Sequence, residues 1–166
     1  NQLYGETLVE AKPLVGEFPR LVGLDGDAKM SKSLNNAIYL SDTEDEVTKK
    51  VMSMYTDPTR VHPTDPGKVE GNPVFIYHDA FNTNKEEVSD LKKRYGEGKV
   101  GDVEVKQKLA KAINEFLAPM RERRRRLEDD PQMVDRILKQ GTENGRKVAE
   151  ETLQKVKAAM KINYQF

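Results

Sequence analysis

The sequence predicts a mainly α-helical protein, and both its composition and its pattern of helix caps support that fold class. Of its 166 residues, 36% are hydrophobic and 34% are charged, which is a low apolar fraction for a compact globule. Such a balance favours well-solvated helices that bury narrow stripes. The formal net charge is zero, so any contact with nucleic acid has to come from local groups of charge.

The first forty residues predict little regular structure. Residues 20–24 predict a short strand that ends at a glycine turn. The turn leads into residues 29–33, here named the lysine loop, in which two lysines stand three positions apart. Residues 37–40 are expected to be extended.

A helix is predicted next, because Thr43 and Glu46 form a capping box and Val47, Val51 and Met54 share one face. It is followed by a stretch rich in proline and glycine, residues 56–72, which predicts an ordered loop or linker. Two roles for this loop stay open, namely a surface connection between subdomains and a contact with a ligand.

Beyond the loop every segment predicts a helix. Asn72 caps a short helix, Thr83 and Glu86 predict a second capping box, and Asp102 opens the longest helix. Because isolated helices of this length are marginal in water, we expect one antiparallel bundle over residues 72–166.

Two features are expected to interrupt the end of the chain. Pro119 lies inside the longest helix and should kink it, because proline removes a backbone donor and clashes with the preceding turn. Gly141 should end a helix that begins at Asp130-Pro131, and Thr142 should cap a last helix.

The lysine loop has the chemistry of a phosphate-binding segment. The glycines ahead of it let the backbone bend and approach a ligand closely, and ammonium groups suit phosphate oxygens. A solvated loop without a ligand is the alternative. A nucleotide P-loop is excluded, since that motif needs Gly-Lys-Ser/Thr in direct sequence and Gly26 is followed by Asp27 and Ala28.

These residues resemble a known family. The run from Gly26 to Ser33 resembles the KMSKS loop of the class I aminoacyl-tRNA synthetases. Its flanks, residues 23–26 and 34–40, resemble the tryptophanyl-tRNA synthetases, and further matches to the bacterial branch are residues 55–58, 64–67 and 70–75. The resemblance runs over essentially the whole chain.

The resemblance implies an ATP-dependent ligase that activates tryptophan and transfers it to tRNA(Trp). Lys32 and Lys29 are then the expected catalytic residues, and the ATP-binding loop consists of Lys29, Met30, Ser31, Lys32 and Ser33. Mg²⁺ would arrive with ATP, and no protein-bound metal site is expected. A homodimeric, cytoplasmic full-length protein with no membrane contact is implied as well.

The same resemblance divides the chain into three parts. Residues 1–40 are expected to be the end of a Rossmann-like catalytic domain that carries the lysine loop, residues 41–71 a helix and connecting loop, and residues 72–166 a helical domain of the anticodon-binding type. The chain is expected to be a C-terminal fragment that is inactive alone, because the N-terminal half of the active site, with its His-x-Gly-His loop, is missing.

A second basic feature follows Met120. Five arginines occupy six positions, Arg121, Arg123, Arg124, Arg125 and Arg126. They are candidates for contact with tRNA phosphates, and the alternative is a charged helix end balanced by neighbouring acidic residues.

The remaining residue types exclude other chemistry. Cysteine is absent, which excludes thiol catalysis and disulfides, and His62 and His78 lack the spacing and neighbours of metal ligands. No stretch approaches the length of a membrane span. The alternative function is a non-catalytic helical module that binds RNA or protein. Within the enzyme class the alternative is a tyrosine–tRNA ligase.

Overall fold

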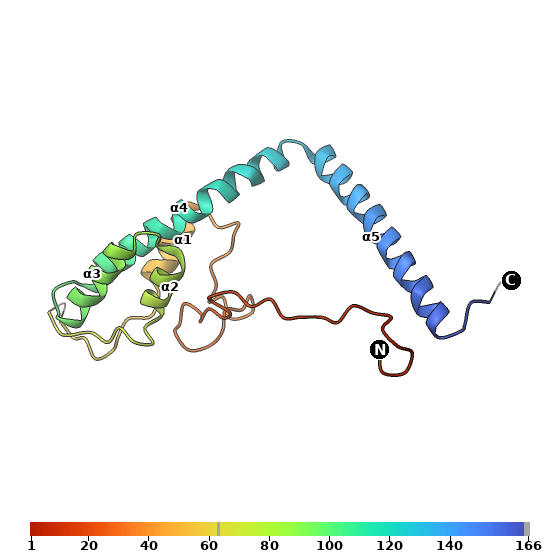
Figure 1. Cartoon of the computed structure of the whole chain (residues 1–166). Coiled ribbons are helices and arrows are strands. Elements are labelled where there is room, and N and C mark those ends of the chain that lie inside the picture. Colours follow the sequence, from red (N-terminus) through yellow and green to blue (C-terminus); the bar gives the residue numbers. More distant parts are fainter. Residues whose placement is uncertain (63, 165–166) are drawn as a thin grey trace. The chain divides into compact units, whose positions relative to one another are not determined.

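The computed structural model describes residues 1–62 and 64–164, and over that range five helices supply the regular structure (Figure 1). They are α1 (Glu44–Met52), α2 (Pro73–Phe81), α3 (Lys85–Gly96), α4 (Asp102–Glu128) and α5 (Pro131–Ala159). The mainly α-helical prediction is confirmed. The strand predicted over residues 20–24 is wrong, since that segment contributes only an isolated antiparallel bridge between Val22 and Lys29.

Internal contacts group the chain into two units. One is Val15–Arg123, which contains α1, α2, α3 and most of α4. The other combines residues 1–14 with the chain from Arg124 onward, and it contains α5. The domain division predicted at residues 40 and 71 stays a prediction.

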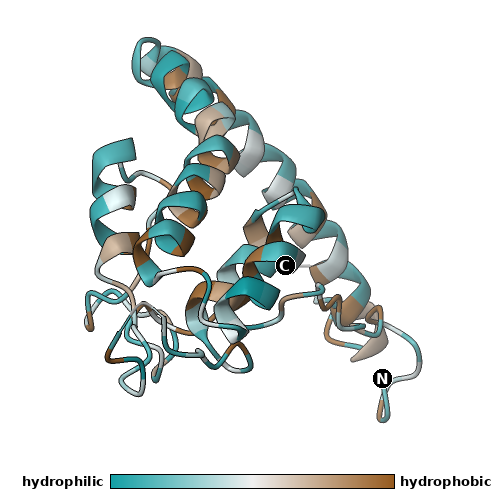
Figure 2. Cartoon of the chain, turned by 90° about the vertical axis from the view of Figure 1, so that its left-hand side faces the viewer, coloured by the Kyte–Doolittle hydropathy of each residue, from teal (hydrophilic) through white to brown (hydrophobic). Residues whose placement is uncertain are grey.

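The core of the Val15–Arg123 unit is formed by narrow apolar stripes, as the composition predicts. In Figure 2 the helices carry brown apolar residues between longer teal stretches. Side chains that are almost completely buried come from all four helices of this unit: Val47, Val51, Phe75, Tyr77, Leu91, Tyr95, Val105 and Leu109. The Phe75 and Tyr95 rings pack edge to face, with 5.0 Å between their centroids.

Side-chain caps fix the starts of α1 and α2 as predicted. The Thr43 hydroxyl accepts from the Glu46 backbone N–H, and the Glu46 carboxylate accepts from the Thr43 backbone N–H at 2.8 Å. Asn72 accepts from the backbone N–H of Val74 at 3.0 Å, with proline at the first helical position. Both caps satisfy backbone donors that a helix start leaves unpaired.

Two other predictions about helix ends are wrong. The cap of α3 is Asn84 and not Thr83 with Glu86, because the amide oxygen of Asn84 accepts the N–H one turn into the helix at 3.0 Å. Gly141 ends no helix and Thr142 caps none, since α5 runs through both. Gly141 does not adopt the left-handed conformation that would stop a helix, and a glycine inside one costs only about 1 kcal/mol relative to alanine.

The two long helices differ in how much they bury. α4 continues through Pro119 and buries six side chains along the Val15–Arg123 unit. α5 buries none, and apolar residues such as Ile137 and Leu153 are about half exposed on it. Of the helices in the bundle predicted over residues 72–166, α2, α3 and α4 therefore contribute buried side chains and α5 does not. The helix α1, which precedes that range, also contributes buried side chains.

His78 joins α2 to α4 inside the core. Its side chain is fully buried, Nε2 donates to the Val105 carbonyl oxygen at 3.0 Å, and Nδ1 accepts from the Asn82 amide at 3.2 Å. A carbonyl oxygen can only accept, which places the single ring proton on Nε2. Burial lowers the pKa of His78, because a charged imidazolium is penalised there.

Stability should therefore fall in mild acid. Below about pH 6.5 the unfolded state takes up a proton at His78, whereas the buried ring of the folded state stays neutral. The stabilisation that His78 contributes to the folded state is therefore complete above the unfolded pKa and is lost as the pH falls through that value. Between about pH 7.5 and about pH 5.5 the unfolding free energy should drop by about 1 kcal/mol more in the wild type than in His78→Gln. Urea unfolding measures this difference. His62→Gln, at an exposed position, should keep the wild-type pH dependence, and an equal dependence in His78→Gln would contradict the interpretation.

Candidate functional site

A tight turn leads into the lysine loop. The Gly23 backbone N–H donates to the Ala28 carbonyl at 2.6 Å, and the Gly26 N–H donates back to the Gly23 carbonyl at 3.0 Å. The bridge between Val22 and Lys29 closes the turn. Gly26 has a φ of +84°, a backbone conformation that residues other than glycine rarely adopt. The local sequence thus determines the direction in which the loop leaves the core.

Both ends of this segment are fastened to the helical core. Leu24 is buried, its N–H donates to the Asn36 carbonyl at 2.9 Å, and its own carbonyl accepts from the Tyr55 N–H at 2.8 Å. From α2 the Tyr77 hydroxyl donates to the Val22 carbonyl at 2.6 Å. The chain before the loop, the chain after it and the end of α1 are therefore held together.

The structure brings the predicted loop residues into one short turn. Lys29 and Lys32 are exposed, whereas Met30 between them packs against the core. The hydroxyls of Ser31 and Ser33 lie 2.9 Å apart in a hydrogen bond. The apolar residue anchors the loop, and both ammonium groups face solvent, where a phosphate could reach them.

The sequence did not indicate the role of Asn36, which is 95% buried directly behind the loop. Its Oδ1 accepts from the Ser31 N–H at 2.8 Å, and its Nδ2 donates to the Lys29 carbonyl at 3.2 Å and to Asp25 Oδ2 at 2.8 Å. We name this set of three hydrogen bonds the Asn36 clamp. Chiefly because Asn36 donates to it, the pKa of Asp25 lies below its usual range.

Gly23 provides the space for the clamp. A Cβ at Gly23 would lie 2.1 Å from Asn36 Nδ2, which is closer than real Cβ atoms approach another atom. The glycine at this position is therefore required by the close approach of a side chain.

Gly23→Ala should push the amide of Asn36 out of place and lower the unfolding free energy by about 1–3 kcal/mol, as overpacking does elsewhere. Gly16→Ala is the matched control, because no atom lies within 4 Å of a Cβ there. Urea unfolding of both variants checks the difference. Equal stability of the two would show that the clamp tolerates the extra methyl group.

A buried lysine on α4 holds the chain segment around Tyr55, which in turn binds the chain ahead of the lysine loop. Lys106 Nζ donates to the Met54 carbonyl at 2.6 Å and to the Thr56 hydroxyl at 2.7 Å. Burial lowers the pKa of Lys106, since the charged form is desolvated. These contacts hold the residues on either side of Tyr55, which binds Leu24. Sequence reasoning missed this role, because a lysine on a helix is normally part of a solvated face.

Polar contacts hold the described part of the predicted loop, residues 56–62 and 64–72, which contains no helix or strand. Asp57 accepts from the backbone and hydroxyl of Thr59 and from the Lys68 N–H, and its pKa is lowered chiefly by the Thr59 hydroxyl. The guanidinium of Arg60 binds Asp102 at 3.0 Å and stacks over the Tyr95 ring at 4.1 Å. A pocket of about 290 Å³ opens beside Asp57. Whether this loop also contacts a ligand stays a prediction.

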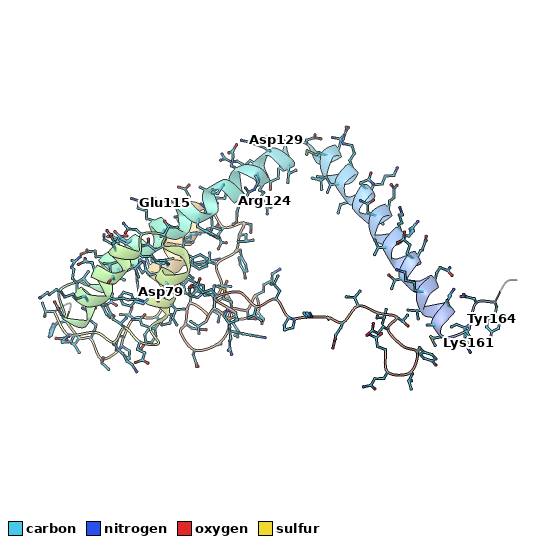
Figure 3. All side chains as sticks on the ribbon, viewed as in Figure 1. Asp79, Glu115, Arg124, Asp129, Lys161 and Tyr164 are labelled. Carbon is cyan, nitrogen blue, oxygen red and sulfur yellow. The ribbon has the colours of Figure 1, made fainter. Side chains whose placement is uncertain are left out.

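The five arginines fall into two environments. Arg121 is mostly buried, and it donates to the Asp42 carbonyl and to Asn114 Oδ1, each at 2.8 Å. The other four, Arg123, Arg124, Arg125 and Arg126, are exposed. Arg124 pairs with Glu128 at 2.7 Å near the C-terminal end of α4, where Figure 3 labels Arg124 and Asp129. The contact of the five arginines with tRNA stays a prediction.

The described part of the chain contains neither a cluster of metal ligands nor a membrane-spanning helix. Within residues 1–62 and 64–164 no three His, Cys, Asp or Glu side chains gather as they would around a metal ion. Among the helices in the described part of the chain, none combines the length and apolar character of a membrane span.

A family of known proteins matches the part of the chain that contains the lysine loop. The model of the class I tRNA synthetases for tryptophan and tyrosine (W and Y) matches residues 4–118. The chain belongs to this family. Tryptophan–tRNA ligases of Treponema pallidum and Chlamydia caviae are 53% and 50% identical to it, each over 98% of the chain. The alignments cover 48% and 47% of those relatives, so the chain spans about half of their length.

A solved structure shows the same similarity in three dimensions. A tryptophanyl-tRNA synthetase of Campylobacter jejuni, in complex with ADP and tryptophan, superposes with a TM-score of 0.75 and 30% identity. The match covers 96% of this chain and 49% of that protein. The resemblance stated from the sequence motifs is thereby confirmed.

Proposed function

We propose that the protein to which this chain belongs is a tryptophan–tRNA ligase, which activates tryptophan with ATP and transfers it to tRNA(Trp). The observation that carries the proposal is a loop with two exposed lysines on a backbone fastened to the core. The relatives that are 53% and 50% identical to this chain over the aligned residues are named for tryptophan, which favours tryptophan over tyrosine. A non-catalytic binding module would have no use for this loop.

In the activation step a carboxylate oxygen of tryptophan attacks the α-phosphorus of ATP. The new oxygen–phosphorus bond forms the adenylate, and the bond from the α-phosphorus to the bridging oxygen breaks, so that this oxygen leaves with pyrophosphate. Negative charge grows on the leaving group, and cations placed there stabilise the transition state more than the ground state. Lys32 supplies the main contact to the β- and γ-phosphates, Lys29 a supporting one, and Mg²⁺ enters with ATP as part of the substrate.

The other residues of the loop shape it. Met30 anchors it against the core, and Ser31 and Ser33 offer hydroxyl groups to ATP. The tryptophan pocket belongs to the other half of the full-length protein. We further propose that this protein is a cytoplasmic homodimer.

The exposed arginines near the end of α4, Arg123–Arg126, are proposed as contacts to tRNA phosphates. Their solvent exposure supports this assignment. Arg121 differs, because two of its guanidinium nitrogens already bind Asp42 and Asn114. We therefore assign Arg121 a mainly intramolecular contact beside any contact with tRNA.

Lys32→Ala in the full-length protein should lower the rate of tryptophan-dependent exchange between ATP and pyrophosphate by about 10- to 100-fold. This is the rate change that corresponds to the free energy of one hydrogen bond to a charged group. Tryptophan binding, measured by calorimetry, should change little. Lys29→Ala should have a smaller effect in the same direction, and Lys93→Ala, at an exposed position of α3, should have none. Equal losses of exchange and of tryptophan binding in Lys32→Ala would contradict the proposed role.

The 166-residue chain alone should show no tryptophan-dependent exchange, because it spans about half of the length of its relatives. A mobile pair of cations without the opposite side of the site is poorly preorganised for catalysis. The same exchange assay, with the full-length protein as positive control, tests this. Exchange by the chain alone would show that it contains a complete site.

A further inference from the structure

We propose that Asn36 is a positioning residue that sets the arrangement of Lys29 and Lys32 for catalysis. This inference rests on the proposed function and assigns a role to a residue outside the lysine loop. The Asn36 amide touches the loop backbone at two points, the Lys29 carbonyl and the Ser31 N–H. Those two groups flank Met30, so the clamp holds the backbone between the two lysines.

Exposed lysines need this kind of support. Each ammonium group stands at the end of a flexible four-carbon side chain. The positions that the ammonium group can reach therefore depend on where the backbone places the Cα atom. Because a misplacement of about 1 Å can cost about 100-fold in rate, a rigid backbone between the two cations matters for the reaction. Burial of 95% and three hydrogen bonds give Asn36 the rigidity that the exposed lysines lack.

Asp25 determines which way the Asn36 amide faces. Its carboxylate only accepts hydrogen bonds, so the NH₂ end of Asn36 turns toward Asp25 and the oxygen end toward the Ser31 N–H. Asp25 is itself held, since its Oδ1 accepts from the Asp27 N–H at 3.2 Å. The contact between Asn36 and Asp25 therefore has a defined donor and acceptor direction, which can be reversed by exchanging the two residues.

The first test is Asn36→Ala in the full-length protein. At saturating ATP and tryptophan, kcat for exchange should fall by about 10- to 100-fold, while the KM for tryptophan stays within about twofold. Asn114→Ala is the matched control, since Asn114 also makes three hydrogen bonds, to Glu44, Thr48 and Arg121, away from the loop. Its kcat should equal that of the wild type.

The second test separates positioning from a general loss of structure. Asn36→Asp places two carboxylates side by side and should lose kcat at least as strongly as Asn36→Ala. In the double variant Asp25→Asn/Asn36→Asp the contact between the two residues returns with donor and acceptor exchanged, and the Ser31 N–H keeps an acceptor. The carboxylate at position 36 cannot donate to the Lys29 carbonyl, so that contact stays broken in both variants. The kcat of the double variant should therefore be higher than that of Asn36→Asp and lower than that of the wild type.

Wild-type kcat in Asn36→Ala, or no recovery in the double variant, would overturn the inference. Loss of kcat only in proportion to the fraction of unfolded protein, measured by circular dichroism, would overturn it as well. Failure of the proposed function gives a different result, because the wild-type protein would then show no tryptophan-dependent exchange at all.

Discussion

The two backbone hydrogen bonds of Leu24 are the contacts on which the candidate site depends. One connects the chain before the lysine loop to the chain after it, and the other connects both to Tyr55, three residues beyond the end of α1. Leu24 itself is buried, so these bonds lie in a region of reduced dielectric, where breaking them leaves polar groups without water. A loop that has to present charge to solvent thereby gains a fixed base.

The apolar and the charged residues of the lysine loop have different roles. Met30 packs on the core, while Lys29 and Lys32 on either side of it stay in water. The ammonium groups keep their hydration until a phosphate displaces it, which avoids the large cost of burying an unpaired charge. Rigidity is supplied from behind by Asn36, a neutral side chain that can be buried once its hydrogen bonds are satisfied.

Charged residues away from the loop serve the fold. Lys106 and Arg60 are both buried, yet each is paired, one with carbonyl and hydroxyl oxygens and the other with Asp102 and the Tyr95 ring. Arg121 likewise ties α4 to the start of α1. A composition that is one-third charged therefore does not mean that every charge is solvated, and the small apolar core is supplemented by such contacts.

The sequence by itself determined several features that depend on neighbours within about one helical turn, although the helix ends predicted at Thr83 and Gly141 were wrong. The caps at Thr43 and Asn72 and the long helix from Asp102 were predicted, because their physics is local. The lysine loop was identified by the resemblance of its motif to a known family. Tertiary structure decided the rest. The Asn36 clamp joins residues up to eleven positions apart, and Lys106 reaches an acceptor 52 positions away. No local pattern reports such contacts, since they exist only once the core has brought distant segments together.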